Sequence, residues 1–294
     1  MAATTIEVPT PRAGGATDAG RVAPPPPPRP LPTAVRVPLD LFAEIGSMVM
    51  LLGATLRASF TPPFSWRRDF VDQAFIIVKR CFIPVVFSTT MFGLGAPGLQ
   101  GGNVVNSFGS VDRLGAFFVM ASVREFAPWI NGMVIAGVGG TAIAADLGAR
   151  KIRDELDAIA VLGLDPVREI VVPRFWALGL ITPLMNLIAI VCGVFGGWIA
   201  AVLVFGETSA GYLSTFTSNF TMPDLLGSVL KTTMFGFIIA LVCCYKGMHV
   251  KGGTQGVGRA VNQAVVIAFA GIWVFNAVFT TTLLAAFPET GNLH

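Results

Sequence analysis

The sequence predicts an all-α integral membrane protein in which an N-terminal interfacial amphipathic helix precedes five transmembrane helices. Of the 294 residues, 53% are hydrophobic and only 13% are charged, whereas about 25% of a soluble domain is charged. The mean hydropathy is +0.71. Apolar stretches of the length that a membrane crossing requires recur along the chain. These observations exclude an ordinary soluble fold.

Residues 1–36 are expected to form a disordered cytoplasmic tail. They lack the apolar core of a signal peptide, and the proline run Pro24–Pro28 is flanked by Arg21 and Arg29. Such a segment is a stiff, solvated polyproline helix that cannot join a packed core. Its role is either that of a spacer or that of a PxxP ligand.

An amphipathic helix is predicted from Pro38 to Phe60, within an interfacial region over 37–72. Between Glu44 and Arg57 the apolar part is only about a dozen residues, fewer than the roughly twenty that a membrane span needs. The alternative is a sixth span. The apolar residues recur at three- and four-residue steps, as in an amphipathic helix: Leu39, Phe42, Ile45, Met48, Val49 and Leu52.

A membrane domain over 73–294 follows. Lys79, Arg80 and Pro84 make its first span the least regular, and the two basic side chains can reach the headgroups if that end is cytoplasmic. The five predicted spans cover about 74–94, 114–145, 175–205, 225–245 and 261–287.

The distribution of positive charge predicts the orientation. Seventeen of the 20 Lys and Arg residues lie before the first apolar core, between spans two and three, or between spans four and five. Positive residues concentrate on the cytoplasmic side. We therefore expect a multi-pass protein of the cytoplasmic (inner) membrane, with its N-terminus in the cytoplasm and its C-terminus on the outer side.

Neither a metal site nor a nucleotide site is predicted. The four cysteines lie in or beside apolar runs and the chain has only two histidines, so membrane packing explains the cysteines better than zinc or disulfides. The loop Gly252–Gly258 lacks the GxxxxGK[ST] pattern and follows no strand. The small residues of spans two and three indicate tight helix packing, with a gate as the alternative; they include Gly132, Ala136, Gly137, Gly139, Gly140, Gly193, Gly196 and Gly197.

Besides Lys79 and Arg80 of the first span, three charged residues lie at membrane depth inside predicted spans, where an isolated ion costs about 2.5 to 3.5 kcal/mol at mid-bilayer. Arg124 and Glu125 are in the second span and Lys231 is in the fourth. Neighbours in sequence do not share a helix face, so Arg124 and Glu125 should contact different partners. Two interpretations fit: a structural ion pair, such as Glu125 with Lys231, or a cavity whose cations bind an anionic headgroup.

The segment Asp146–Arg174 is a charged loop between two apolar spans. A short amphipathic cytosolic helix is predicted over about 148–163, ended by Gly163 and followed by a second start at Asp165 and Pro166. The loop is too short to hold an ATPase, so it is either a docking surface for a separate one or a solvated connector. Its apolar stripe comprises Ile152, Leu156, Ile159 and Ala160.

Several of these segments resemble the MlaE/YrbE family of lipid-transporting ABC permeases. They read VREFAP (Val123–Pro128) and AGVGGTAIAADLGARKIRDELDAIAVLGLDPVREIVVPRFWA (Ala136–Ala177). The later CYKGMHVKGGTQGVGRAVNQAVV (Cys244–Val266) is similar to the actinobacterial YrbE branch associated with Mce proteins, and the resemblance also includes PFSWRRDF (Pro63–Phe70). One departure is Val138, which stands where the family commonly has Arg. The role of that arginine is then absent from this chain or supplied by another subunit.

The resemblance implies a dimeric permease with a coupling helix that contacts a cytosolic ABC ATPase subunit. The implied contact residues are Ile152, Arg153, Asp154, Glu155, Leu156, Asp157 and Ile159. Arg124, Glu125 and Lys231 would line a lipid cavity. The partners implied are a second YrbE-type permease, as a heterodimer or a homodimer, and Mce proteins on the outer side.

The function expected is that of a permease subunit that moves lipids across or out of the cytoplasmic membrane. The chain itself would hold no catalytic residue, metal or cofactor and bind no nucleic acid, and ATP hydrolysis would occur in the partner. Two alternatives are a proton-coupled secondary transporter built around Glu125 and a scaffold that anchors Mce proteins without transport. Few other mid-span carboxylates exist to support the first alternative.

Overall fold

The computed structural model describes residues 33–62 and 64–287, and side chains from residue 42 onward. The expected N-terminal tail lies almost entirely outside the described residues. Within them, all regular secondary structure is helical. The architecture follows from composition, because a chain surrounded by lipid must pair every backbone N–H and C=O within itself, and helices achieve this locally.

Five segments are long and apolar enough to cross a membrane, as predicted. Each is longer than the sequence alone indicated. The first two are interrupted by wider π-helical turns and the third begins with one; helices α10 and α11 are the fourth and fifth. The segments are Arg67–Ser107, Val111–Ile152, Val167–Leu203, Met222–Met248 and Gly253–Ala286.

The first two segments are assembled from several helices. The first comprises α2 (Arg67–Gly93), a π-helical segment (Leu94–Gly101) and α3 (Gly102–Ser107). The second comprises a 3-10 turn (Val111–Arg113), α4 (Leu114–Phe118), a π-helical segment (Val119–Phe126), α5 (Ala127–Val134), another π-helical segment (Ile135–Gly140) and α6 (Thr141–Ile152).

The remaining elements are α7 (Glu155–Val161), a π-helical segment (Val167–Val171) leading into α8 (Val172–Leu203), α9 (Ser209–Asn219), α10 (Met222–Met248) and α11 (Gly253–Ala286). The sequence analysis did not predict α9, which caps the far end of the bundle. Thr208 starts it by accepting a hydrogen bond from the Gly211 N–H at 3.1 Å.

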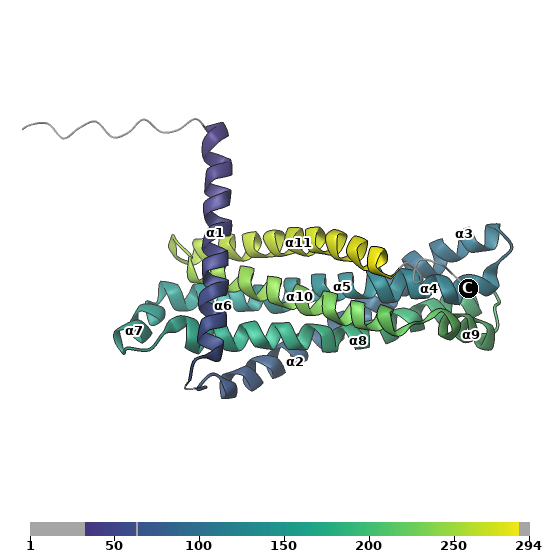
Figure 1. Cartoon of the computed structure of the whole chain (residues 1–294), viewed down its shortest axis with the longest axis horizontal. Coiled ribbons are helices and arrows are strands. Elements are labelled where there is room, and N and C mark those ends of the chain that lie inside the picture. The colour runs from purple at the N-terminus through teal and green to yellow at the C-terminus, as the bar shows by residue number, and fades with distance from the viewer. Residues whose placement is uncertain (1–32, 63, 288–294) are drawn as a thin grey trace, which may run out of the picture. The chain divides into compact units, whose positions relative to one another are not determined.

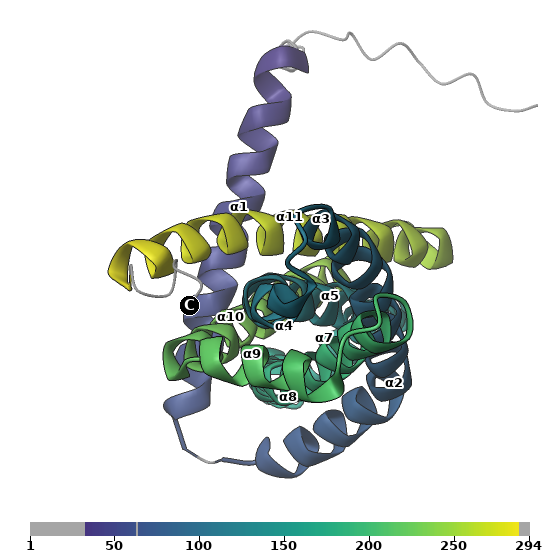
Figure 2. The same cartoon turned by 90° about the vertical axis from the view of Figure 1, so that its right-hand side faces the viewer.

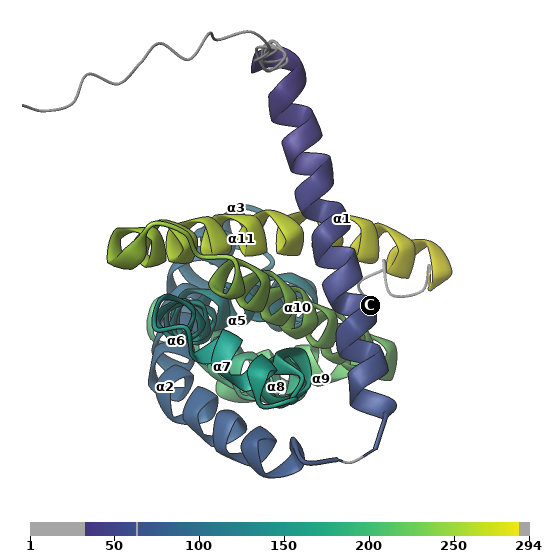
Figure 3. The ribbon, with the colours of Figure 1, turned by 90° about the vertical axis from the view of Figure 1, so that its left-hand side faces the viewer.

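The second segment is central, because α5 and α6 between them contact α2, α8, α10 and α11. Figure 1 shows these helices running alongside one another, with α7 at one end and α3 and α9 at the other. The views from the two ends show α9 in front of α8 (Figure 2) and α7 beside α6 and α8 (Figure 3). The charged loop and α9 are therefore on opposite ends of the helices.

Small residues let these helices approach closely, which confirms the packing interpretation for most of them. A Cβ at Gly196 would lie 2.3 Å from the Thr90 carbonyl oxygen, and one at Gly93 would lie 2.3 Å from that of Gly193. The backbones of α2 and α8 thus touch where only hydrogen fits. Gly137 differs, since a Cβ there would meet nothing within 4 Å.

Helix α1 (Thr33–Phe60) ends just before Pro62, as predicted. It is not among the segments that are long and apolar enough to cross a membrane. From Glu44 onward it has two faces. Met48, Leu51, Thr55 and Ser59 are buried, whereas Ile45, Val49, Leu56 and Phe60 are exposed. An inner packed face beside an outer apolar face suits a helix that lies at a membrane interface.

Candidate functional site

A cluster of charged side chains joins the second, fourth and fifth spans. Arg124 and Glu125 stand at the end of the π-helical segment Val119–Phe126, and π-helical turns frequently occur at functional positions. Glu125 Oε1 accepts a hydrogen bond from Thr280 Oγ1 at 2.7 Å, and its Oε2 accepts one from Asn276 Nδ2 at 2.9 Å. Both of these partners come from α11.

Lys231 is the buried cation of this cluster, with only 2% of its side chain exposed. Its ammonium group donates to the Arg124 carbonyl oxygen at 2.7 Å, to Glu125 Oε1 at 3.1 Å and to Thr280 Oγ1 at 2.8 Å. An ammonium group has three protons to donate, so these acceptors use its full capacity. The predicted ion pair between Glu125 and Lys231 is confirmed.

Arg124 turns to a different partner, as expected for a neighbour in sequence. Its Nε donates to Asp224 Oδ1 at 2.7 Å, and Asp224 is almost completely buried. Asp224 also completes a capping box at the start of α10, where its Oδ2 accepts from the Thr221 N–H at 3.1 Å and from Thr221 Oγ1 at 2.7 Å. The Asp224 carboxylate therefore both holds the Arg124 side chain and caps the start of α10.

The cluster is balanced in charge, since two carboxylates face two cations. Lys231 and Asp224 are buried and fully engaged, and only Glu125 keeps a third of its side chain exposed. In this arrangement the cluster joins three spans. The group that it exposes to a ligand is the Glu125 carboxylate and not a free cation. Binding of an anionic headgroup by Arg124 and Lys231 stays a prediction.

The sequence analysis missed Asp224, Asn276 and Thr280 as members of the cluster. A signal existed for Asp224, because Thr221 and Asp224 have the spacing of a capping box before an apolar run. The α11 residues are uncharged and give no comparable signal. Val138, the departure from the family pattern, is half-buried and packs against the core.

An apolar groove of about 350 Å³ opens between α8, α9 and α10. It continues the outer face of α8, where Leu180, Leu184 and Phe195 are also exposed. Such a face must be covered by lipid, by ligand or by another protein. The lining residues are Leu187, Ile190, Val191, Val194, Phe216, Phe220 and Leu225.

The charged loop between α6 and α8 differs from the single helix expected over about 148–163. Helix α6 ends at Ile152, and α7 begins at Glu155. Between them Asp154 adopts a left-handed conformation with φ of 57°, which costs about 1–2 kcal/mol. The correction has a physical reason: the break lets Leu156, 5% exposed, enter the core, a gain of about 1.5–3 kcal/mol.

The break also forms an ion pair that a continuous helix would prevent. Lys151 Nζ lies 3.0 Å from Asp157 Oδ1, although residues six apart in one helix point in different directions. Arg153 Nε donates to Glu155 Oε1 at 2.7 Å, and this bond raises the pKa of the Arg153 guanidinium above its ordinary value. The loop charges therefore pair with one another.

The end of α7 forms as the sequence predicted. Gly163 has φ of 78°, and the N–H groups of Gly163 and Leu164 donate to the carbonyl oxygens of Ala160 and Ile159 at 3.0 and 3.2 Å. This double closure is a Schellman motif. The next helical segment starts where Asp165 Oδ1 accepts from the Val167 N–H at 2.9 Å.

The exposed apolar surface of the loop is not the predicted stripe. Leu156 is buried and Ile159 is half-buried, whereas Ile152 is 37% exposed. The large apolar side chains that face outward lie at the end of α7 and just beyond it: Val161, Leu162 and Leu164 are 87%, 76% and 50% exposed. We call these three residues the loop patch. Helical periodicity could not reveal it, because the patch continues past the end of the helix.

Together the five apolar segments and the helical structure of the described residues define a multi-pass helical membrane protein. Residues 70–282 match the family described as Permease MlaE, which is more than two thirds of the chain. The chain is 32% identical over 201 residues to a probable ABC transporter permease protein of Rickettsia typhi, covering 68% of this chain and 78% of that one.

Two further relatives have more specific names. The intermembrane phospholipid transport system permease protein MlaE of Haemophilus influenzae is 24% identical over 253 residues, covering 84% of this chain and 95% of the relative. The chloroplastic protein TRIGALACTOSYLDIACYLGLYCEROL 1 of Arabidopsis thaliana is 29% identical over 168 residues, covering 57% and 48% of the two chains. This chain therefore belongs to the MlaE permease family. Its place in the YrbE branch stays a prediction.

Proposed function

We propose that this chain is the permease subunit of an ABC-type lipid transporter, driven by a separate cytosolic ATPase and working with Mce-type proteins on the outer side. Family membership supports the transporter class. A relative that covers 84% of this chain is named as part of an intermembrane phospholipid transport system, which supports lipid as the cargo. The apolar groove of about 350 Å³ has a lining suited to acyl chains.

The observation that carries the ATPase part of the proposal is the loop patch at the end of α7. Val161 and Leu162 are 87% and 76% exposed on a loop that also exposes charged residues such as Arg153 and Asp157. The loop is anchored at both ends, since α6 enters it as a continuation of the second span and Val167 begins the third. A push on the patch would therefore pass into two spans at once, which is the mechanical requirement for coupling.

The proposed transport cycle uses these parts in sequence. Closure of the ATPase pair presses on the loop patch, α6 and α8 transmit the displacement, and a lipid cavity shared with a second permease chain opens or collapses. The Arg124, Glu125 and Lys231 cluster keeps the second, fourth and fifth spans moving together, because it joins them by short polar contacts.

The test replaces Val161 and Leu162 by Asp and measures how much ATPase subunit co-purifies with the chain. We expect a loss of at least tenfold with normal membrane insertion, because charged groups would replace the apolar contact. Phe108→Asp is the matched control, being 80% exposed at the opposite end of the bundle. Equal ATPase recovery from the loop variant and the control would refute coupling through the patch. Transport by the chain without any ATPase would favour a secondary transporter instead.

A further inference from the structure

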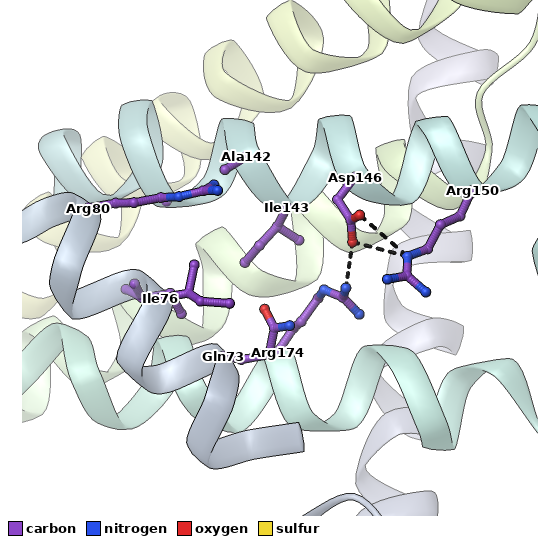
Figure 4. A pocket seen from close by; sticks show the side chains of 10 residues that line it. Gln73, Ile76, Arg80, Ala142, Ile143, Asp146, Arg150 and Arg174 are labelled. Atoms are coloured by element: carbon purple, nitrogen blue, oxygen red, sulfur yellow. Dashed lines mark hydrogen bonds and ion pairs between the residues drawn. The ribbon is translucent and has the colours of Figure 1, made fainter. Parts of the chain in front are cut away.

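A polar pocket lies at the loop end of the bundle, apart from the charged cluster around Lys231. It has a volume of about 290 Å³ and is formed where α2, the second span and α8 meet. Figure 4 shows the side chains that surround it. Its lining residues are Gln73, Ile76, Ile77, Arg80, Gly139, Ala142, Ile143, Asp146, Arg150 and Arg174. None of them belongs to the charged cluster or to the apolar groove.

The pocket holds more positive than negative charge. Asp146 is its one carboxylate, and it accepts from Arg174 Nη2 at 2.6 Å and from Arg150 Nε at 3.2 Å. Arg174 is nearly buried and is held further by the Ile170 carbonyl oxygen at 2.8 Å. Arg150 Nη1 also lies 3.9 Å from Glu155 Oε2, just outside the pocket. Two carboxylates therefore face three arginines, and the positive charge left over is that of Arg80. A positive charge that no carboxylate balances, close to the buried Arg174, favours the binding of an anion in the pocket.

Two donors in the pocket are not engaged by the protein. Neither Arg80 nor Gln73 makes an ion pair or hydrogen bond to any described residue. Arg80 extends along the pocket toward Ala142 in Figure 4. At this point of the lining Gly139 has no side chain and Ala142 has only a methyl group, which leaves the space open. A guanidinium group with free N–H donors matches the planar, paired oxygens of a phosphate or carboxylate.

The position of Arg80 indicates where such an anion would come from. It lies within α2 among residues whose apolar side chains point outward, Phe75 at 67% exposure and Ile83 at 68%. An exposed face of this kind contacts lipid, and arginine at such a place pairs with headgroups. The pocket is therefore open to the side, at the end of the bundle nearest the charged loop.

We propose that this pocket binds a phosphate group, presented by an anionic lipid of the surrounding leaflet or as free phosphate. The group would pair with Arg80 of α2, the arginine of the pocket that no described carboxylate engages, and would lie beside Ala142 of α6. This site shares no lining residue with the apolar groove, and its assignment does not depend on the proposed function.

The test measures lipid binding by the purified membrane complex, using native mass spectrometry in discs of phosphatidylcholine with added phosphatidylglycerol. Arg80→Gln is expected to lower the apparent affinity for phosphatidylglycerol about tenfold, the loss of a charge-assisted hydrogen bond. The control is Lys79→Gln, which removes the same charge from the adjacent exposed residue outside the pocket. Ala142→Leu fills the pocket without changing its charge and should also weaken binding.

A second measurement distinguishes the two sources of phosphate. Inorganic phosphate is titrated against the complex in discs of pure phosphatidylcholine, and the unfolding temperature is followed. A phosphate-dependent rise that Arg80→Gln removes and Lys79→Gln retains supports free phosphate, whereas retention of phosphatidylglycerol against millimolar phosphate supports the lipid. If Arg80→Gln and Ala142→Leu match Lys79→Gln in both measurements, the pocket is not a phosphate site.

Discussion

At the scale of single residues, the charged cluster shows how a membrane protein accommodates ions inside its spans. Lys231 is stabilised because every proton of its ammonium group has an acceptor, and all three acceptors lie on other spans. Glu125 is stabilised by Lys231, Asn276 and Thr280. Each ion thus replaces its hydration shell with protein groups, which makes the cluster sensitive to the loss of any member.

The replacement Lys231→Met tests that sensitivity. It leaves Glu125 without its cation and is expected to destabilise the protein by about 3 to 5 kcal/mol, the cost of breaking a buried ion pair by removing one partner. The measurement is the unfolding temperature of the purified protein. Adding Glu125→Gln should recover part of the loss, because the uncompensated charge is then removed.

Lys79→Met serves as the control, since Lys79 is exposed and its replacement should change stability by less than about 0.5 kcal/mol. An unfolding temperature for Lys231→Met equal to that of this control would show that the cluster contributes little to stability.

At the scale of elements, the close approach of α2 and α8 depends on glycine. The Gly196 backbone packs directly against the Thr90 carbonyl oxygen, and both helices are long enough to transmit a local shift along the bundle. Because apolar burial gives no net drive for association in lipid, dispersion contacts at such points hold the helices together.

The replacement Gly196→Ala should therefore separate the two helices and destabilise the protein by about 1 to 3 kcal/mol, the usual cost of overpacking. Gly95→Ala is the matched control, because a Cβ at Gly95 would meet nothing within 4 Å. Thermal unfolding of both variants provides the comparison. If the two variants unfold at the same temperature, α2 and α8 accommodate the added methyl group, and their close contact at Gly196 does not contribute to stability.

The loop illustrates the limit of sequence patterns at this scale. The start at Asp165 and the stop at Gly163 were predicted because both are local backbone signals. The break at Asp154 and the inward turn of Leu156 were not, because they depend on the core that Leu156 enters. Helical periodicity predicted that Leu156 lies on the outer apolar surface of the loop. In the structure Val161 and Leu162 form that surface.

At the scale of the whole molecule, one span, Val111–Ile152, connects the α3 end to the charged loop, so a single membrane crossing would place the two on opposite sides. The excess of Lys and Arg predicts that the loop is cytoplasmic. Leu162 and Phe108 mark the two ends, with exposed fractions of 76% and 80%. Single cysteines at these positions can therefore report the orientation directly.

We expect a membrane-impermeant thiol reagent to label Phe108→Cys in right-side-out vesicles and Leu162→Cys in inside-out vesicles. Cys81, Cys243 and Cys244 are buried, and Cys192 is half-buried within the third span, where an impermeant reagent does not reach. The unmodified chain should therefore give a low background. The reverse labelling pattern would invert the predicted topology and place the loop patch where no cytosolic ATPase can reach it.

The sequence by itself determined the class of fold, the five spans and three charges that needed partners. These follow from composition and from the length of the apolar stretches. A long apolar segment is stable in a lipid bilayer rather than in water, and there it must form a helix that pairs its own backbone groups. Only the tertiary structure decided which groups those charges meet, that Asp224 neutralises Arg124, and that Arg80, Arg150 and Arg174 share one pocket. Such encounters join residues that are far apart in the chain, 100 positions for Arg124 and Asp224 and 155 for Glu125 and Thr280. The packing of one helix against another sets them, and no local pattern encodes that packing.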